Sequence, residues 1–116
     1  MSIIENEYVD VARRFANALM ECKFDEACAF LSAECQTKYS ADALRHHYNE
    51  MLDYVAQPVT EIEVIETLDA WPAKQLGDIG WAYVSMSGNG FAEAVAVVVQ
   101  SENSVLKVRS IEWGRP

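Results

Sequence analysis

The chain has only two histidines, His46 and His47, and they stand next to each other within residues 44–51. Two imidazole rings can hold a metal ion or transfer a proton, so this segment is the first candidate for chemistry. If the segment is helical, each residue turns by about 100° from the one before it, and two neighbouring rings cannot point into one site. We therefore expect no metal site here.

Helical geometry gives the two histidines different surroundings. The apolar stripe of this helix is expected to consist of Leu44, Tyr48, Met51, Leu52 and Val55. His46 falls on the opposite side, four residues from Glu50, which predicts a weak surface pair. His47 falls at the edge of the stripe beside Tyr54, where it could act as a general base, although a packed structural histidine is the simpler interpretation.

Two carboxylates are further candidates, because each could face an apolar interior and act there as an acid or a base. Glu93 follows the turn at Asn89-Gly90 on the same predicted face as Met86, and Glu66 interrupts the alternation of an earlier strand. Exposure at a rim is the simpler interpretation for both carboxylates. If the protein is an enzyme, the candidate catalytic residues are His47, Tyr54, Tyr8 and Glu93.

The composition limits the number of domains and the classes of partner. A chain of 116 residues with 51% hydrophobic and 23% charged residues has enough apolar material for one folded domain, residues 1–116. The net charge of -9, from 18 acidic and 9 basic side chains, opposes contact with nucleic acid and anionic membranes. The same charge favours association with a basic protein, although acidity also serves solubility.

The cysteines and the first residues indicate a cytoplasmic protein. Cys22, Cys28 and Cys35 are odd in number and match no zinc spacing, so we expect reduced thiols, no bound metal and no cofactor. Residues 1–7 carry acidic groups where a signal peptide would be basic, and no apolar run is long enough to span a bilayer.

Apolar residues at helical spacing predict three helices in the first half of the chain. Their predicted starting residues are, in order, Ser2 (with Glu5 in a capping box), Asp25 and Ser40. The second helix is expected to end near the polar run 32–38. The third helix carries the histidines and is expected to end before Pro58.

From residue 59 the apolar period changes to alternation, which predicts strands. The first strand is expected at residues 59–69, and the sequence allows two registers after Val64. A β-bulge at that point would turn Ile65 inward and Glu66 outward, whereas strict alternation would turn Glu66 inward. A loop is expected at residues 70–78.

Three further antiparallel strands are expected within residues 79–113, joined by two-residue turns at Asn89-Gly90 and Glu102-Asn103. One face of the sheet then collects the apolar residues Ala82, Val84, Met86, Val95, Val97, Val99, Leu106 and Val108, which the helices must cover. The other face collects Trp81, Tyr83, Ala94, Ala96, Val98, Lys107, Arg109, Ile111 and Trp113.

This second face is the candidate binding surface, because large aromatic side chains and arginine are enriched at protein contacts. The residues expected to carry binding are Trp81, Tyr83, Arg109, Ile111 and Trp113. The competing interpretation is that the C-terminal tail or the loop around Trp71 covers these side chains within one chain.

The element order resembles a known superfamily. Three helices precede a curved four-stranded antiparallel sheet, and Phe15-Ala16-Asn17-Ala18-Leu19 leads through a turn into Phe24-Asp25-Glu26-Ala27. In these features nearly the whole chain resembles the nuclear transport factor 2-like (SnoaL-like, cystatin-like α+β) superfamily. The resemblance implies that the sheet wraps around the first helix as a cone, whose open end can hold a small ligand. Enzymatic members place carboxylates, tyrosines or histidines inside that cone.

We match no such catalytic set residue by residue, and we therefore expect binding rather than catalysis. The second face of the sheet is expected to bind a protein partner or, in a homodimer, a second copy of the chain. A more specific form is an immunity protein that neutralises a basic toxin, a function that occurs in the superfamily. The alternative is a small-molecule-binding protein, or an enzyme resembling ketosteroid isomerase, that uses the cone pocket.

Overall fold

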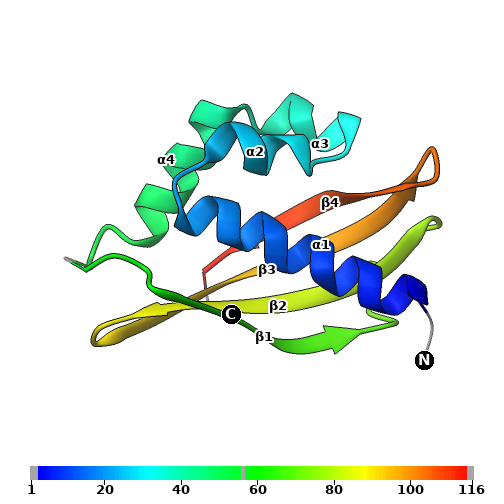
Figure 1. Ribbon diagram of the computed structural model, residues 1–116. Coiled ribbons are helices and arrows are strands. Elements are labelled where there is room, and N and C mark those ends of the chain that lie inside the picture. The colour runs from blue at the N-terminus through cyan, green and yellow to red at the C-terminus, as the bar shows by residue number, and fades with distance from the viewer. Residues whose placement is uncertain (1–2, 56, 115–116) are drawn as a thin grey trace.

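The computed structural model of the chain describes residues 3–55 and 57–114. Within these residues four helices precede four strands (Figure 1). The helices are α1 (Ile3–Met20), α2 (Phe24–Ala29), α3 (Ala33–Lys38) and α4 (Ala41–Met51), and the strands are β1 (Glu61–Leu68), β2 (Asp78–Gly88), β3 (Phe91–Glu102) and β4 (Val105–Trp113). The side chains of the predicted capping box, Ser2 and Glu5, lie outside what the structure describes.

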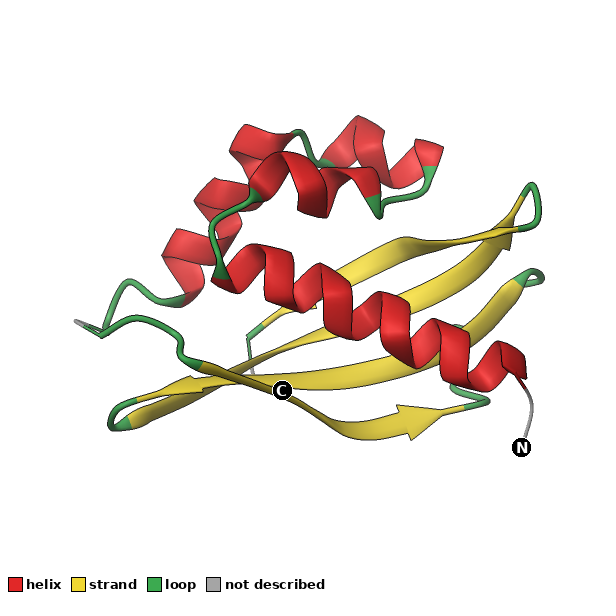
Figure 2. Ribbon diagram, in the orientation of Figure 1, coloured by secondary structure: helices red, strands yellow, loops and turns green. Residues whose placement is uncertain are grey.

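The strands form one open antiparallel sheet in the order β1-β2-β3-β4. The helices lie on one side of this sheet, and α1 runs directly across it (Figure 2). We call the side that faces α1 the inner face and the opposite side the outer face. The fold is α+β, with helices packed on an antiparallel sheet, as predicted. None of the described helices is long and apolar enough to cross a membrane.

The inner face carries the hydrophobic core. All eight residues predicted for this face belong to the core or pack against it, and only Leu106 keeps some exposure. The helix α1 covers the face with Phe15 and Leu19, which are fully buried. Removal of this apolar surface from water is what holds the helices on this side of the sheet.

Tyr8 and Gly80 fix the approach of α1 to β2. The ring of Tyr8 is buried directly over Gly80, and a Cβ atom on Gly80 would lie only 2.3 Å from Cζ of Tyr8. Glycine is therefore required here to let the helix approach the strand. Tyr8, one of the four candidate catalytic residues, is a core residue in this position.

The predicted second helix is in fact two helices. The polar run 32–38 was expected to be the end of a helix, but it forms α3, and α2 begins at Phe24 after Lys23 rather than after Asp25. The hydroxyl of Ser32 accepts a hydrogen bond from the backbone N–H of Cys35 at 3.1 Å and so caps α3. The predicted cap of α4 is confirmed, because Ser40 accepts from the N–H of Ala43 at 3.1 Å.

The first strand contains a β-bulge after Val64, which is one of the two registers that the sequence allowed. Val64 pairs with Val84, and Glu66 pairs with Tyr83, so Ile65 is the extra residue. Cross-strand partners share a face, which places Glu66 on the outer face. Ile65 does not turn inward as expected for a bulge, since 59% of it is exposed.

A second bulge changes which face the end of β4 presents. The turn before β4 is Asn103-Ser104 rather than Glu102-Asn103, and the pairing shifts between Val98 and Val99, leaving Arg109 as the extra residue of β4. Ile111 then pairs with Val97, and Trp113 pairs with Val95. Those two valines are fully buried on the inner face. The prediction that Ile111 and Trp113 lie on the outer face is therefore wrong.

Candidate functional site

An aromatic pair dominates the outer face. Trp81 and Tyr83 stack with ring centroids 6.1 Å apart and an interplanar angle of 17°. Their cross-strand partners Val98 and Ala96 are only 7% and 6% exposed, although the helices lie on the other side of the sheet. Of the five residues predicted to bind a partner, Trp81 and Tyr83 are the two that form a partly exposed aromatic surface on the outer face.

Arg109, also predicted to bind a partner, is engaged within the chain. Its Nε and Nη2 atoms donate to the two carboxylate oxygens of Asp78, each at 2.7 Å. The side chain of Asp78 is fully buried, and that of Arg109 is 17% exposed. The hydrogen bond with Asp78 raises the pKa of Arg109 above its ordinary value. A two-pronged pair of this kind holds the bulge of β4 to the start of β2.

Carboxylates flank Tyr83 of the aromatic pair on both sides. The strand register places Glu63 opposite Ser85, Glu66 opposite Tyr83 and Glu112 opposite Ala96, and all three glutamates are exposed. Lys107 shares this face by register, but its Nζ atom donates to the backbone oxygen of Ala29 at 2.8 Å. The outer face is therefore acidic around an aromatic centre. We call Glu63, Glu66 and Glu112 the acidic rim.

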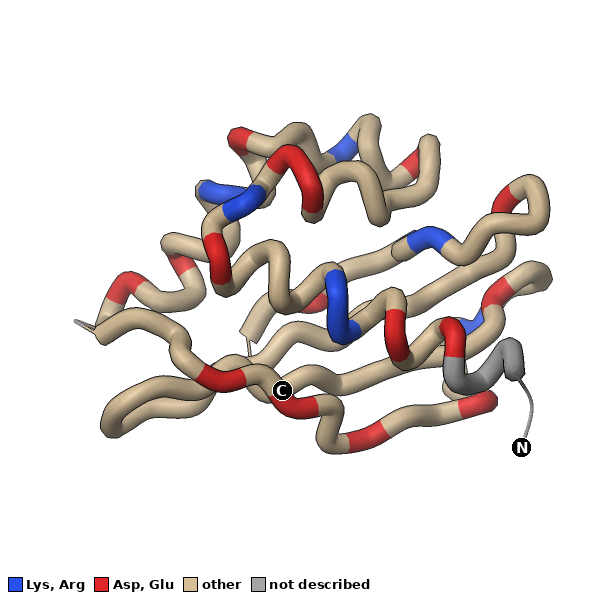
Figure 3. The backbone as a smooth tube through the Cα atoms, in the orientation of Figure 1, with Lys and Arg blue, Asp and Glu red and all other residues tan. Residues whose placement is uncertain are grey.

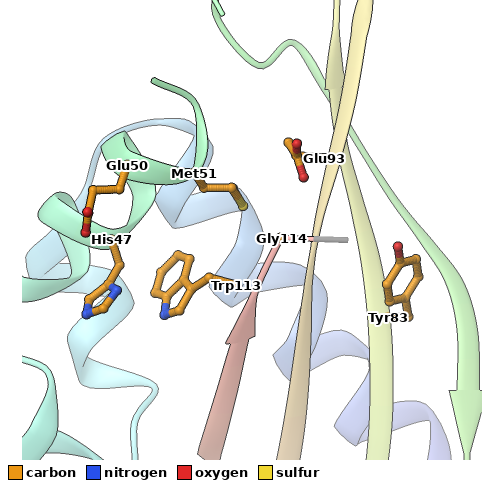
Figure 4. A pocket seen from close by; sticks show the side chains of 7 residues that line it. All are labelled: His47, Glu50, Met51, Tyr83, Glu93, Trp113 and Gly114. Atoms are coloured by element: carbon orange, nitrogen blue, oxygen red, sulfur yellow. The ribbon is translucent and has the colours of Figure 1, made fainter. Parts of the chain in front are cut away.

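A pocket of about 740 Å³ lies between α4 and the ends of the strands. Its lining residues are His47, Glu50, Met51, Tyr83, Glu93, Trp113 and Gly114. In Figure 4 the side chains of Met51 and Glu93 reach toward the same space from opposite sides, and the indole of Trp113 lies beside the ring of His47. The last backbone hydrogen bond between β3 and the end of the chain is donated by the N–H of Gly114 to the oxygen of Ala94, at 2.9 Å. Beyond this bond the pocket extends around the end of β4, and Tyr83 also lines it.

Stacked aromatic rings form one wall of this pocket. The rings of His47 and Trp113 are 5.5 Å apart between centroids, with an interplanar angle of 12°. Tyr39 packs edge-on against both rings, at 5.2 Å from His47 and 6.2 Å from Trp113. The indole N–H of Trp113 is buried and has no hydrogen-bond acceptor within the described structure. His47 is therefore a packed ring, beside Tyr39 and Trp113.

The two histidines have separate environments, as helical geometry predicted. The Nε2 atom of His46 lies 2.9 Å from a carboxylate oxygen of Glu50 at the surface, whereas His47 lines the pocket. Among the described residues, no three His, Cys, Asp or Glu side chains gather as they would around a metal ion.

The structure brings together three of the four candidate catalytic residues. His47 and Glu93 line the same pocket, and the hydroxyl of Tyr54 donates to Oε2 of Glu93 at 2.6 Å. Tyr8 lies apart, in the core between α1 and β2. Sequence reasoning did not find Trp113 for this site, because it placed Trp113 on the outer face.

A signal for Trp113 was nevertheless present in the sequence. The apolar residues Leu106 and Val108 occupy even positions, and Ile111 and Trp113 occupy odd ones. A change of phase within one strand is what a β-bulge produces.

Comparison of the chain with protein-family models, with curated proteins and with solved structures finds no match. The function must therefore be argued from the outer face and the pocket themselves.

Proposed function

We propose that this protein is a non-enzymatic binding domain whose outer face binds a basic protein partner. The single observation that carries the proposal is the stacked pair of Trp81 and Tyr83 on the face of the sheet that lies away from the helices. Aromatic side chains lose little conformational entropy when they are buried by a partner and contribute large contact areas, which is why they recur at the centres of interfaces.

Charge favours a basic partner over a second copy of the chain. The acidic rim flanks Tyr83 of the aromatic pair, and the charge of Arg109 is taken up by Asp78. Two copies docked through this face would bring like charges together in the contact, which opposes association. A basic surface would meet complementary charge, and the net charge of -9 would speed its approach.

A more specific form of the proposal is an immunity protein that neutralises a basic toxin in the cytoplasm. The net charge of -9 supports this form. We also propose the cone architecture of the nuclear transport factor 2-like superfamily, supported by the order of helices and strands and by the position of α1 across the sheet. A toxin gene adjacent to the gene for this chain would be the first partner to test.

The test is to capture partners with immobilised wild-type chain, to purify each one, and to titrate it calorimetrically against three forms of the chain. The forms are wild type, Trp81→Ala/Tyr83→Ala, and Glu66→Lys. We expect a basic partner whose affinity falls at least about 100-fold with the double variant, because two central aromatic contacts are lost. Because Glu66 is exposed, the Glu66→Lys substitution should leave the fold intact. It should weaken binding of the partner and reduce the dependence of the affinity on salt.

The matched control is Tyr54→Ala, which removes an exposed aromatic residue outside the outer face. Binding that is unchanged by both outer-face variants would contradict the proposal. A wild-type chain with a solution mass of twice 13.0 kDa, reduced to the monomer by the double variant, would establish self-association instead.

A second candidate function is small-molecule binding in the pocket. The observation in its favour is that His47 and Glu93 line one open pocket, with Tyr54 bonded to Glu93. The volume of this pocket, about 740 Å³, is within the size range of small-molecule sites.

A further inference from the structure

We infer that the pocket between α4 and the strand ends binds an organic cation, in particular a guanidinium or ammonium group carried on a short apolar chain. The inference rests on the second candidate function, small-molecule binding, and names its ligand class. The pocket shares Tyr83 with the aromatic pair of the outer face, but binding of a small ligand in it does not require a partner on that face.

The pocket lining carries negative charge. Glu93 of β3 and Glu50 of α4 line the pocket, and no Lys or Arg stands among its described lining residues. The carboxylate of Glu50 is paired with His46 at the surface and points away from Glu93 (Figure 4). Glu93 is held in place by the hydrogen bond from Tyr54 at 2.6 Å. Its carboxylate repels anions and attracts a cation, which it can also bind through charge-assisted hydrogen bonds.

An aromatic ring lies on the same side of the strands as Glu93. Trp113 lines the pocket there, whereas Tyr83 lines it from the other side of the strands (Figure 4). Indole is the aromatic group that attracts cations most strongly. The stack with His47 and the edge contact with Tyr39 hold the indole in one orientation. A planar guanidinium can lie on an aromatic ring and bind a carboxylate with two parallel hydrogen bonds, so it fits this combination better than a compact ammonium does.

Met51 is the lining residue with a long apolar side chain, and it can pack against the apolar part of the ligand. Its flexible thioether faces the same space as Glu93 in Figure 4. The arrangement therefore offers a charged end and an apolar side to one ligand. Such a ligand can be a free small molecule or the side chain of Arg or Lys on a bound protein, and both share the same chemistry.

The test uses two probes of the same shape, n-butylguanidinium and the neutral n-butylurea, each titrated into the folded chain at constant ionic strength. The NMR signals of Glu93, Gly114 and the indole N–H of Trp113 report on the pocket, and the indole N–H of Trp81 reports on the outer face. We expect saturable shifts at the pocket with n-butylguanidinium. The affinity for n-butylurea should be lower by a factor of at least about ten.

The variants Glu93→Gln and Glu7→Gln form a matched pair, because each removes one negative charge. Glutamine at position 93 can still accept the hydrogen bond from Tyr54, so the fold should be kept. Glu93→Gln should weaken binding of n-butylguanidinium roughly tenfold, and Glu7→Gln, an exposed residue of α1 outside the pocket and the acidic rim, should leave it unchanged. Equal losses in both variants would show attraction by the overall charge and would overturn the inference.

The remaining outcomes separate the inference from the function on which it rests. Equal binding of both probes at the pocket would overturn the choice of a cation while leaving a small-molecule site. If neither probe gave a saturable shift, both the inference and the second candidate function would be lost. Displacement of a purified basic partner by n-butylguanidinium would identify a protein side chain as the source of the cation, and binding without displacement would identify a free ligand.

Discussion

At the scale of single residues, Arg109 and Asp78 form a buried ion pair between β4 and β2. It joins the bulge of β4 to the start of β2, and the backbone N–H of Gln75 donates to the same carboxylate at 2.8 Å. A carboxylate with no exposed surface needs these partners, because an unpaired buried charge is strongly destabilising.

We therefore predict that Arg109→Leu lowers the free energy of unfolding by about 3 kcal/mol or more, as measured by urea denaturation. The control is Arg45→Leu, because Arg45 forms an ion pair with Asp42 in which both side chains are more than half exposed. That variant should lose at most about 1 kcal/mol. Losses of similar size in the two variants would contradict a structural role for the buried pair.

Cys35 gives a prediction about pH. Burial raises the pKa of its thiol to about 11, from 9.0. The folded chain therefore keeps this proton to higher pH than the unfolded chain does, so stability is unaffected below pH 9 and falls as the pH rises through about 11. Over this range the free energy of unfolding should drop by about 2 kcal/mol on account of this thiol. Cys35→Ala should flatten the decrease, and Cys22→Ala, which changes an exposed cysteine, should leave it unchanged.

At the scale of elements, the sequence predicts the order of helices and strands well, because long segments with a clear period dominate it. It fails where an element is short or where one residue is inserted. The helix α3 has six residues, of which only Cys35 is buried, so it has almost no apolar period. The bulge at Arg109 is marked in the sequence only by the change of apolar phase between Val108 and Ile111, and the bond that joins Arg109 to Asp78, 31 positions away, has no local signal. Because of this one extra residue, Ile111 and Trp113 lie on the inner face. Strict alternation therefore did not predict that Trp113 lines the pocket.

The turn before β4 gives a prediction at this scale. Asn103 and Ser104 have φ angles of 51° and 67°, the left-handed region that a two-residue hairpin turn of this hand requires. Serine is strained in this region and glycine is not, so Ser104→Gly should stabilise the chain by about 1 kcal/mol. Ser101→Gly, within β3, should instead destabilise it by about 0.5–1 kcal/mol. A decrease in melting temperature for Ser104→Gly would contradict the turn geometry.

At the scale of the whole molecule, charge and apolar surface are divided between the two faces of the sheet. The inner face is covered by the helices, and acidic residues recur along β1 at the edge of the sheet (Figure 3). The outer face joins this acidic edge to the stacked pair of Trp81 and Tyr83, and Tyr83 also borders the pocket. The two proposed sites are therefore adjacent, yet each has its own reporter, because Trp81 is on the outer face and Trp113 is on the inner face.

The indole N–H signals of these two tryptophans provide the most direct test of the central claim, that the outer face binds a basic partner. On addition of the purified partner, the signal of Trp81 should shift or broaden in proportion to the complex formed, whether or not the signal of Trp113 also moves. A complex that shifts Trp113 and leaves Trp81 unchanged would place the partner at the pocket and contradict the claim.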